Sequence, residues 1–132
     1  MRPYGPNVIS FEVATGRRRW YTIGCYLAPD DARTIERVVT ALGEQPRGTA
    51  LIVAGDLNTD LGDMACDGRG MEIAAEITEA GLEDMTEHFL PRKMRWGRER
   101  RTWAMVRWGK AIRSRTDYIL GTDRSLFRNV AV

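Results

Sequence analysis

The chain has 132 residues, of which 43% are hydrophobic, and this size predicts one folded domain spanning residues 1–132. No run of about 18 apolar residues occurs, so we expect no membrane-spanning segment. The first six residues lack the apolar core of a signal peptide, which predicts an intracellular protein. Cys25 and Cys66 are too few for a disulfide framework and lack the spacing of a zinc site.

The chain is predicted to open with a β-hairpin. Residues 8–14 and 20–28 have the composition of strands, and a Thr-Gly pair between them favours a turn. Pro29 should end the second strand, and either Asp30 or Asp31 can cap the helix that follows.

That helix is indicated by four apolar residues with the spacing i, i+3, i+4, i+7, followed by a glycine that ends it. The four residues are Ile35, Val38, Val39 and Leu42, and the glycine is Gly43. Residues 50–54 are then all apolar, which is typical of a strand buried on both faces. The order strand, helix, strand predicts a parallel pair with a crossover helix and therefore an α/β fold.

The buried strand leads directly into Gly55, Asp56 and Asn58, and this stretch carries the strongest functional signal. Residues at i and i+2 of a strand point to the same side, so Asp56 and Asn58 could face one ligand. A carboxylate can accept a proton or hold a metal-bound water, and a carboxamide can donate to a phosphate oxygen. Gly, Asp and Asn are also ordinary turn residues, so a turn without chemistry stays an alternative.

The second half of the chain is predicted from shorter signals. Residues 59–70 are rich in Asp and Gly but do not fit a calcium loop, so we expect a surface loop followed by a helix over 70–80. Residues 82–85 are expected to form a short strand, and His88, beside Phe and Leu, is expected to be structural. The remaining predicted strands are residues 101–106 and 111–120, joined as a hairpin at Trp108-Gly109, and residues 127–132.

Positive charge gathers between residues 92 and 115, where ten basic residues face one acid, while the rest of the chain has 10 basic and 17 acidic residues. Such a distribution suits binding of a polyanion, and interleaved tryptophans favour a nucleic acid. A solvated basic hairpin that binds nothing is the alternative. The residues expected to contact nucleic acid are Arg98, Arg100, Arg101, Trp103 and Arg115.

Asp117 lies where a polar run meets an apolar strand, and the nearby Arg113 and Arg115 should keep it ionised. A structural ion pair is the simpler interpretation of Asp117 alone.

Four segments in order resemble the endonuclease/exonuclease/phosphatase superfamily, the fold of DNase I, and most closely the endonuclease domains of non-LTR retrotransposons. They are Tyr26-Leu27-Ala28-Pro29, Ala54-Gly55-Asp56-Leu57-Asn58, Arg101-Thr102-Trp103 and Arg115-Thr116-Asp117-Tyr118-Ile119-Leu120. The resemblance implies a DNase I-like α/β sandwich. It also implies a phosphodiesterase that uses Mg²⁺ (or Mn²⁺), acts on DNA in the nucleus, and is joined to a reverse transcriptase in the parent protein.

The resemblance also implies a role for each matching residue. Tyr26 would hydrogen-bond the scissile phosphate, and Asp56 would orient or deprotonate the attacking water and contribute weakly to holding the metal. Asn58 would bind a phosphate oxygen, and Asp117 would orient a catalytic histidine. In-line attack at phosphorus needs such a positioned water, donors for the extra negative charge, and a cation.

The chain departs from the family pattern at both ends. The strands that carry an Asn and the metal-holding Glu in the family have no match, and the final Ser-Asp-His triplet is absent. The resemblance therefore implies a partial domain that is weak or inactive alone, with bare sheet edges near residues 8–14 and 127–132 that could pair with a second copy. The alternatives are a non-catalytic nucleic-acid or protein binding module that uses residues 92–115, and a phosphatase for a small or lipid phosphate.

Overall fold

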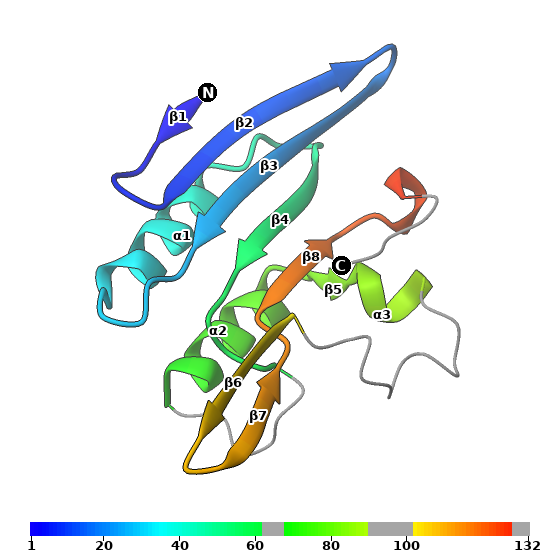
Figure 1. Cartoon of the computed structure of the whole chain (residues 1–132). Coiled ribbons are helices and arrows are strands. Elements are labelled where there is room, and N and C mark those ends of the chain that lie inside the picture. The colour runs from blue at the N-terminus through cyan, green and yellow to red at the C-terminus, as the bar shows by residue number, and fades with distance from the viewer. Residues whose placement is uncertain (62–67, 90–101, 128–132) are drawn as a thin grey trace.

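The computed structural model describes residues 1–61, 68–89 and 102–127, and all structural statements below refer to these residues. Strands and helices follow one another along the chain as Figure 1 shows. The strands are β1 (Arg2–Pro3), β2 (Val8–Thr15), β3 (Arg18–Tyr26), β4 (Ala50–Asp56), β5 (Glu83–Asp84), β6 (Trp103–Arg107), β7 (Lys110–Ser114) and β8 (Asp117–Gly121). The helices are α1 (Arg33–Gly43), α2 (Gly68–Glu79), α3 (Met85–Phe89) and the 3-10 turn η3 (Arg124–Leu126).

Six strands form one mixed sheet in the order β1-β2-β3-β4-β8-β5, and β6 and β7 form a separate hairpin. Strands β3 and β4 are parallel, and the other neighbours in the sheet are antiparallel. Helix α1 connects β3 to β4, so the predicted strand-helix-strand unit is confirmed. The carboxyl ends of β3 and β4 therefore meet at the same edge of the sheet, beside the start of β8.

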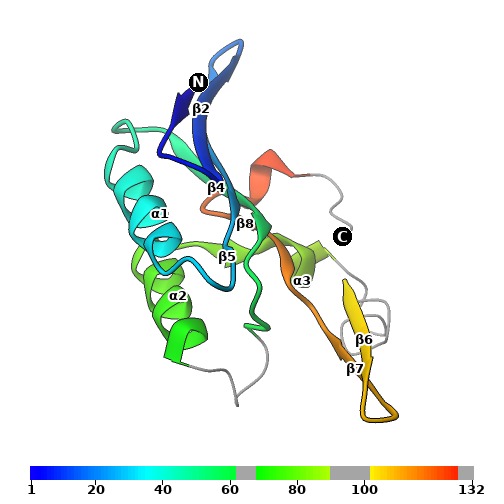
Figure 2. The same ribbon diagram turned by 60° about the vertical axis from the view of Figure 1, so that its left-hand side comes forward.

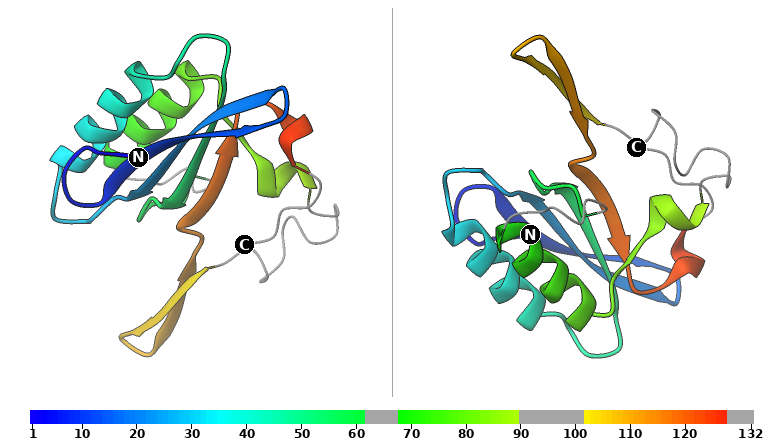
Figure 3. Two further views of the ribbon diagram at one scale, coloured as in Figure 1. Left: turned by 90° about the horizontal axis from the view of Figure 1, so that it is seen from above. Right: turned by 90° about the horizontal axis from the view of Figure 1, so that it is seen from below.

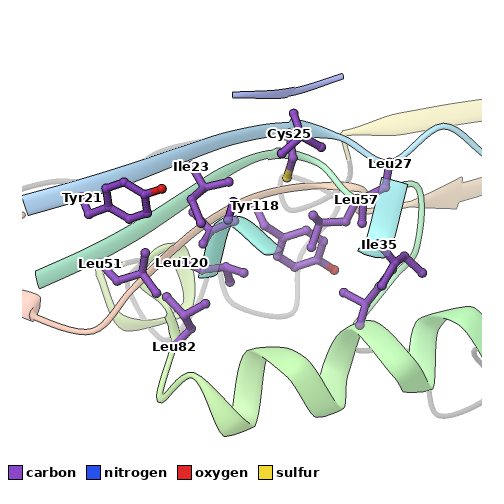
Figure 4. Close-up of a cluster of buried hydrophobic side chains, with 14 residues drawn as sticks. Tyr21, Ile23, Cys25, Leu27, Ile35, Leu51, Leu57, Leu82, Tyr118 and Leu120 are labelled. Atoms are coloured by element: carbon purple, nitrogen blue, oxygen red, sulfur yellow. The ribbon is translucent and has the colours of Figure 1, made fainter. Parts of the chain in front are cut away.

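Helices α1 and α2 lie on the same face of the sheet, which is clearest in Figures 2 and 3. Side chains alternate along each strand, so every second residue of β3, β4 and β8 points under these helices. Ile23 is fully buried, and Leu51 and Leu120 are each 1% exposed. Figure 4 shows these side chains packed together with Leu27 and Leu57, which follow β3 and β4, and with Ile35 of α1. The helix-covered face is thus the hydrophobic core of the chain.

The opening hairpin is confirmed, but it is longer than predicted. Its two-residue turn consists of Gly16, with φ +58°, and Arg17, and the pairing begins immediately with Thr15 opposite Arg18. Strand β3 consequently starts before the expected Trp20, because pairing with β2 holds the arginines in extended conformation. Helix α1 ends at the predicted Gly43. Its N-cap residue is Ala32 rather than Asp30 or Asp31, and Asp31, one position earlier, accepts the main-chain N–H of Arg33 at 3.1 Å.

The predicted long strand over residues 111–120 is wrong in one respect, because it is two strands. It breaks at Arg115 and Thr116, so β7 pairs with β6 and β8 pairs with β4. The turn of the β6–β7 hairpin is at Trp108-Gly109, as predicted, and both residues have positive φ, +49° and +71°. This is the geometry of the tight turns that suit the right-handed twist of paired strands.

The other sequence predictions have mixed outcomes. Helix α2 starts at Gly68, two positions before the predicted start, and β5 occupies part of the predicted strand 82–85. Val39, one of the four apolar residues whose spacing predicted α1, is 38% exposed. Phe127 follows η3 outside any strand, and residues 128–132 of that predicted strand lie outside the described residues. Among the described helices, none is long and apolar enough to cross a membrane.

Self-association through sheet edges stays a prediction. Strand β1 pairs with β2 only at Ile9 and Ser10, so within the described chain the outer edge of β2 beyond these residues carries no neighbouring strand. Phe11 at this edge is 36% exposed. Unpaired strand edges favour association with another chain, which a measurement of molecular mass in solution would detect.

Candidate active site at the ends of three strands

Three of the residues singled out from the sequence lie in one row across the sheet. Tyr26, the last residue of β3, is the register partner of Asp56, the last residue of β4. Asp56 is in turn the register partner of Asp117, the first residue of β8. Directly opposite residues on antiparallel strands, such as Asp56 and Asp117, have Cβ atoms about 4.5–5.5 Å apart. Residues 26, 56 and 117 are thus brought together by strand pairing alone.

The row lies on the sheet face opposite α1 and α2. Its sequence neighbours Cys25 and Tyr118 are buried in the core, at 7% and 4% exposure, and alternation places the row on the other face. Tyr26 is 45% exposed, while Asp56 and Asp117 are partly exposed. The three side chains are therefore reachable from solvent on a rigid sheet.

Gly55 allows β4 to reach this position. Its φ is +154°, and a Cβ atom added there would lie 1.7 Å from the carbonyl oxygen of Cys25 on the neighbouring strand. Only glycine fits such a close approach of two backbones. The ladder continues past it, because the N–H of Leu27 donates to the carbonyl of Asp56 at 2.8 Å. A glycine at position 55 is thus needed for β4 to run beside β3 up to Asp56.

Asn58 is close to the row, but it reaches it by a turn. Strand β4 ends at Asp56, so the expected strand-like alternation of Asp56 and Asn58 is wrong. Asn58 has φ +50°, and its main-chain N–H donates to Oδ1 of Asp56 at 2.8 Å. Its side-chain amide donates to the carbonyl of Leu27 at 3.1 Å, which uses one of its two amide hydrogens. The turn interpretation and the site interpretation thus describe the same segment.

Arg115, predicted to contact nucleic acid, is not placed to do so. Its side chain is 4% exposed, and its guanidinium makes two bonds to the carboxylate of Asp84, at 2.5 and 3.0 Å. The carbon of the guanidinium lies 4.3 Å from the centre of the Tyr118 ring. The arginine expected to keep the Asp117 carboxylate ionised thus pairs with Asp84 and only reaches the main-chain carbonyl of Asp117. Arg115 is two residues from Asp117 in the sequence, but in the folded chain its charge is paired with the carboxylate of Asp84.

Three supporting residues were given no role from the sequence. Thr102 Oγ1 accepts from the N–H groups of Thr116 at 3.0 Å and Asp117 at 3.2 Å, and so holds the start of β8. Asp60 accepts the main-chain N–H of Arg115 at 3.1 Å, and Asp84 holds its guanidinium. No pattern in the sequence marks these contacts, because each joins segments that are far apart along the chain.

Burial sets the protonation of two groups beneath the row. Burial, together with the nearby charge of Asp56, raises the pKa of the Cys25 thiol to about 12. Burial also raises the pKa of the Tyr118 hydroxyl to about 12. Both groups stay protonated at neutral pH, so Cys25 does not supply a thiolate nucleophile. Among the described residues of the row, the ionisable groups that reach solvent are the two aspartates and Tyr26.

The donor set of the row suits a hard cation only in part. Asp56 and Asp117 offer carboxylate oxygens, and Mg²⁺ is commonly held by one or two carboxylates together with water and substrate phosphates. Within the described residues there is no cluster of three or more His, Cys, Asp or Glu side chains that could hold a metal. Asp56 and Asp117 are the described carboxylates of the row that could contribute to holding Mg²⁺, and by themselves they are only a partial set of ligands.

The predicted nucleic-acid segment is described only in its hairpin. Arg98, Arg100 and Arg101 lie outside the described residues, and Trp103 is the first residue of β6. The hairpin projects from the body of the molecule in every view (Figures 1–3). At its tip Trp108 is 85% exposed, with the guanidinium of Arg107 4.3 Å from its ring centre.

His88 lies on the short helix α3, which directly follows β5 along the chain. Its side chain is exposed, and its ring meets that of Phe89 edge-on at 5.0 Å. His88 is not one of the residues of the row, and we assign no chemical role to it.

A mixed sheet with helices on one face and polar groups at the ends of its central strands defines a DNase I-like α/β fold, present here as a partial domain. The chain belongs to the endonuclease/exonuclease/phosphatase family, which matches residues 2–132. No curated relative matches the chain.

Two solved structures share the fold. The endonuclease domain of TRAS1, a telomere-specific non-LTR retrotransposon, is 22% identical with a TM-score of 0.66, over 91% of this chain and 52% of that one. An endonuclease/exonuclease/phosphatase family protein from Leptotrichia buccalis C-1013-b is 18% identical with a TM-score of 0.61, over 89% of this chain and 42% of that one. The chain thus spans about half the length of these structures.

Proposed function

We propose that the row of Tyr26, Asp56 and Asp117, with Asn58 beside it, is the site of a metal-dependent phosphodiesterase that cleaves DNA. The observation that carries the proposal is the register that places residues 26, 56 and 117 side by side at the ends of three neighbouring strands. Family membership supports nuclease-like chemistry in general, and the fold shared with a retrotransposon endonuclease domain supports DNA as the substrate.

The residues divide the work of in-line displacement at phosphorus. Asp56 accepts a proton from the attacking water, while the Tyr26 hydroxyl and the second amide hydrogen of Asn58 donate to phosphate oxygens. Asp117, on the other side of Asp56 from Tyr26, would orient a histidine that protonates the leaving oxygen, and the family's histidine for this role has no match in the sequence of this chain. When bound, Mg²⁺ (or Mn²⁺) supplies neutralisation of the phosphate charge. The rigidity of paired strands keeps these groups in position before substrate binds.

We propose further that this chain by itself cleaves slowly. Charge neutralisation at phosphorus is usually the largest catalytic contribution, and only two carboxylates of the described residues share the row. The parent protein would then contain more of the domain, in an intracellular setting and next to a reverse transcriptase.

Nicking of a supercoiled plasmid in the presence of Mg²⁺ or Mn²⁺ tests the proposal. We expect slow nicking that Asp56→Ala abolishes and that Asp30→Ala, a change at an exposed aspartate outside the row, leaves intact. Nicking that is equally fast with Asp56→Ala, or that persists in excess chelator, would contradict the assignment of the site. Fast nicking that depends on Asp56 would retain the site and contradict the low activity of the isolated chain.

A second candidate function is non-catalytic binding of nucleic acid by residues 92–115. The exposed Trp108 next to Arg107 favours it, because an aromatic ring and a cation together suit unpaired bases and phosphates. DNA binding should then weaken steeply with salt, survive Asp56→Ala, and be lost when Arg98, Arg100 and Arg101 are neutralised. Binding that is unaffected by these neutralisations would exclude this function.

A further inference from the structure

The ion pair between Arg115, whose side chain is 4% exposed, and Asp84, whose side chain is 20% exposed, connects β5 to the start of β8. Asp84 belongs to β5, and it receives two bonds from the guanidinium of Arg115, which precedes β8. The third donor of the same guanidinium, Nε, bonds the main-chain carbonyl of Asp117 at 3.2 Å. The planar fork therefore spans from an edge strand to the first residue of β8, which carries one carboxylate of the candidate site.

The main chain of Arg115 adds a second connection, toward the loop that follows Asn58. Its N–H donates to Oδ2 of Asp60 at 3.1 Å, and its carbonyl accepts from the Tyr118 hydroxyl at 3.2 Å. The same hydroxyl accepts the N–H of Leu61 at 2.8 Å. One residue thus links the loop after β4 to the start of β8, from beneath the row.

We propose that Asp84 and Arg115 are positioning residues that hold Asp117 opposite Asp56 and hold the 58–61 loop beside it. This inference rests on the proposed function in so far as Asp56 and Asp117 are taken as site residues. The contacts that hold them are present whether or not the chain catalyses a reaction. Arginine is required because its rigid fork makes the bidentate contact while Nε reaches a third acceptor, and lysine can do only part of this. The neighbouring pair of Glu83 and Arg124 is joined at 2.6 Å but is about half exposed, and within the described part of the chain neither side chain bonds a residue of the row.

Amide hydrogen exchange, resolved by residue, tests the proposal with the variants Arg115→Lys and Asp84→Asn and the control Glu83→Gln. We expect exchange at Leu61 and Asp117 to accelerate at least about tenfold in Arg115→Lys, because local opening there no longer has to break the fork. Core amides in β3 and β4 should stay within about twofold of the wild type. Lysine keeps the charge, so this variant is expected to fold even where Asp84→Asn does not.

Each outcome decides the question. Acceleration confined to the start of β8 and the 58–61 loop supports a positioning role. Acceleration of all amides together, or none in Arg115→Lys, shows that the pair contributes only to global stability and overturns it. Glu83→Gln should leave both groups of amides unchanged, and a matching local effect there would also overturn it.

Plasmid nicking by the same proteins separates this inference from the proposed function. If the site is positioned as described, nicking by Arg115→Lys should show a lower kcat with little change in KM, since substrate contacts remain while reacting groups are displaced. A wild-type protein that shows no metal-dependent nicking counts against the proposed function, whereas the exchange result still decides the positioning role.

Discussion

The backbone at Gly55 provides the sharpest prediction about this fold, because a single added methyl group must displace the strand that carries Asp56. In Gly55→Ala the new Cβ would lie 1.7 Å from the carbonyl oxygen of Cys25, a backbone atom that cannot rotate away. Its φ of +154° also lies in a region that alanine rarely adopts.

Two contributions give the size of the effect. The unfavourable backbone conformation costs about 1–3 kcal/mol, and shifts that relieve an overpacked contact cost about another 1–3 kcal/mol. We therefore expect Gly55→Ala to lower the free energy of unfolding by roughly 2–6 kcal/mol, a large share of the 5–15 kcal/mol typical of a domain.

Urea denaturation followed by circular dichroism measures this loss, and Gly48→Ala is the matched control. Gly48 also has positive φ, +75°, but a Cβ added there meets no atom within 4 Å. The control should lose only about 1–2 kcal/mol, the cost of a left-handed conformation for a residue with a side chain. Equal losses in the two variants would refute the reasoning that close approach to β3 is what requires glycine.

Three further predictions concern pH, the hairpin tip and the start of β8. Burial raises the folded-state pKa of Cys25 from 9.0 to about 12, so above pH 9 the unfolded chain loses the thiol proton while the folded chain keeps it. The free energy of unfolding should therefore be unaffected by this group below pH 9 and fall as the pH rises toward 12. In Cys25→Ser the loss of stability should start nearer pH 10, where Tyr118 begins to contribute because burial raises its pKa from 10.0 to about 12. The same dependence of unfolding free energy on pH in both proteins would contradict this. Trp108→Asn should raise the free energy of unfolding by up to about 1 kcal/mol, since asparagine tolerates the left-handed turn, and should weaken DNA binding if the ring stacks on bases. Thr102→Val should lower the free energy of unfolding by about 1–3 kcal/mol by removing an acceptor from two main-chain N–H groups, and Thr102→Ser should not; indistinguishable variants would show that the hydroxyl bonds are not needed.

The exposed row offers groups for chemistry, whereas the contacts of Arg115 beneath it hold the backbone in place. Tyr26, Asp56 and Asp117 face solvent on one side of the sheet, while the Arg115 guanidinium and the Tyr118 ring lie on the protein side. A charged group that is held by two bonds and excluded from water is expensive to disturb, so it holds adjacent backbone firmly. The arrangement explains how a short partial domain keeps its polar residues in fixed relation.

The sequence by itself determined the features that depend on local patterns. Apolar runs and the spacing of α1 predicted the strand-helix-strand unit, and glycines marked the turns of both hairpins. Polar residues at the borders of apolar strands drew attention to Asp56, Asn58 and Asp117, and the resemblance to the family added Tyr26 and gave each residue its expected role. These signals are all written within a few neighbouring residues.

Tertiary structure alone decided which of these groups meet and which charges pair. Strand register set Asp56 between Tyr26 and Asp117, and the interior position of Arg115 joined it to Asp84, although it stands two residues from Asp117. Both results depend on contacts between segments separated by about 30 residues or more, and the energy of such contacts depends on burial and geometry that no local pattern carries.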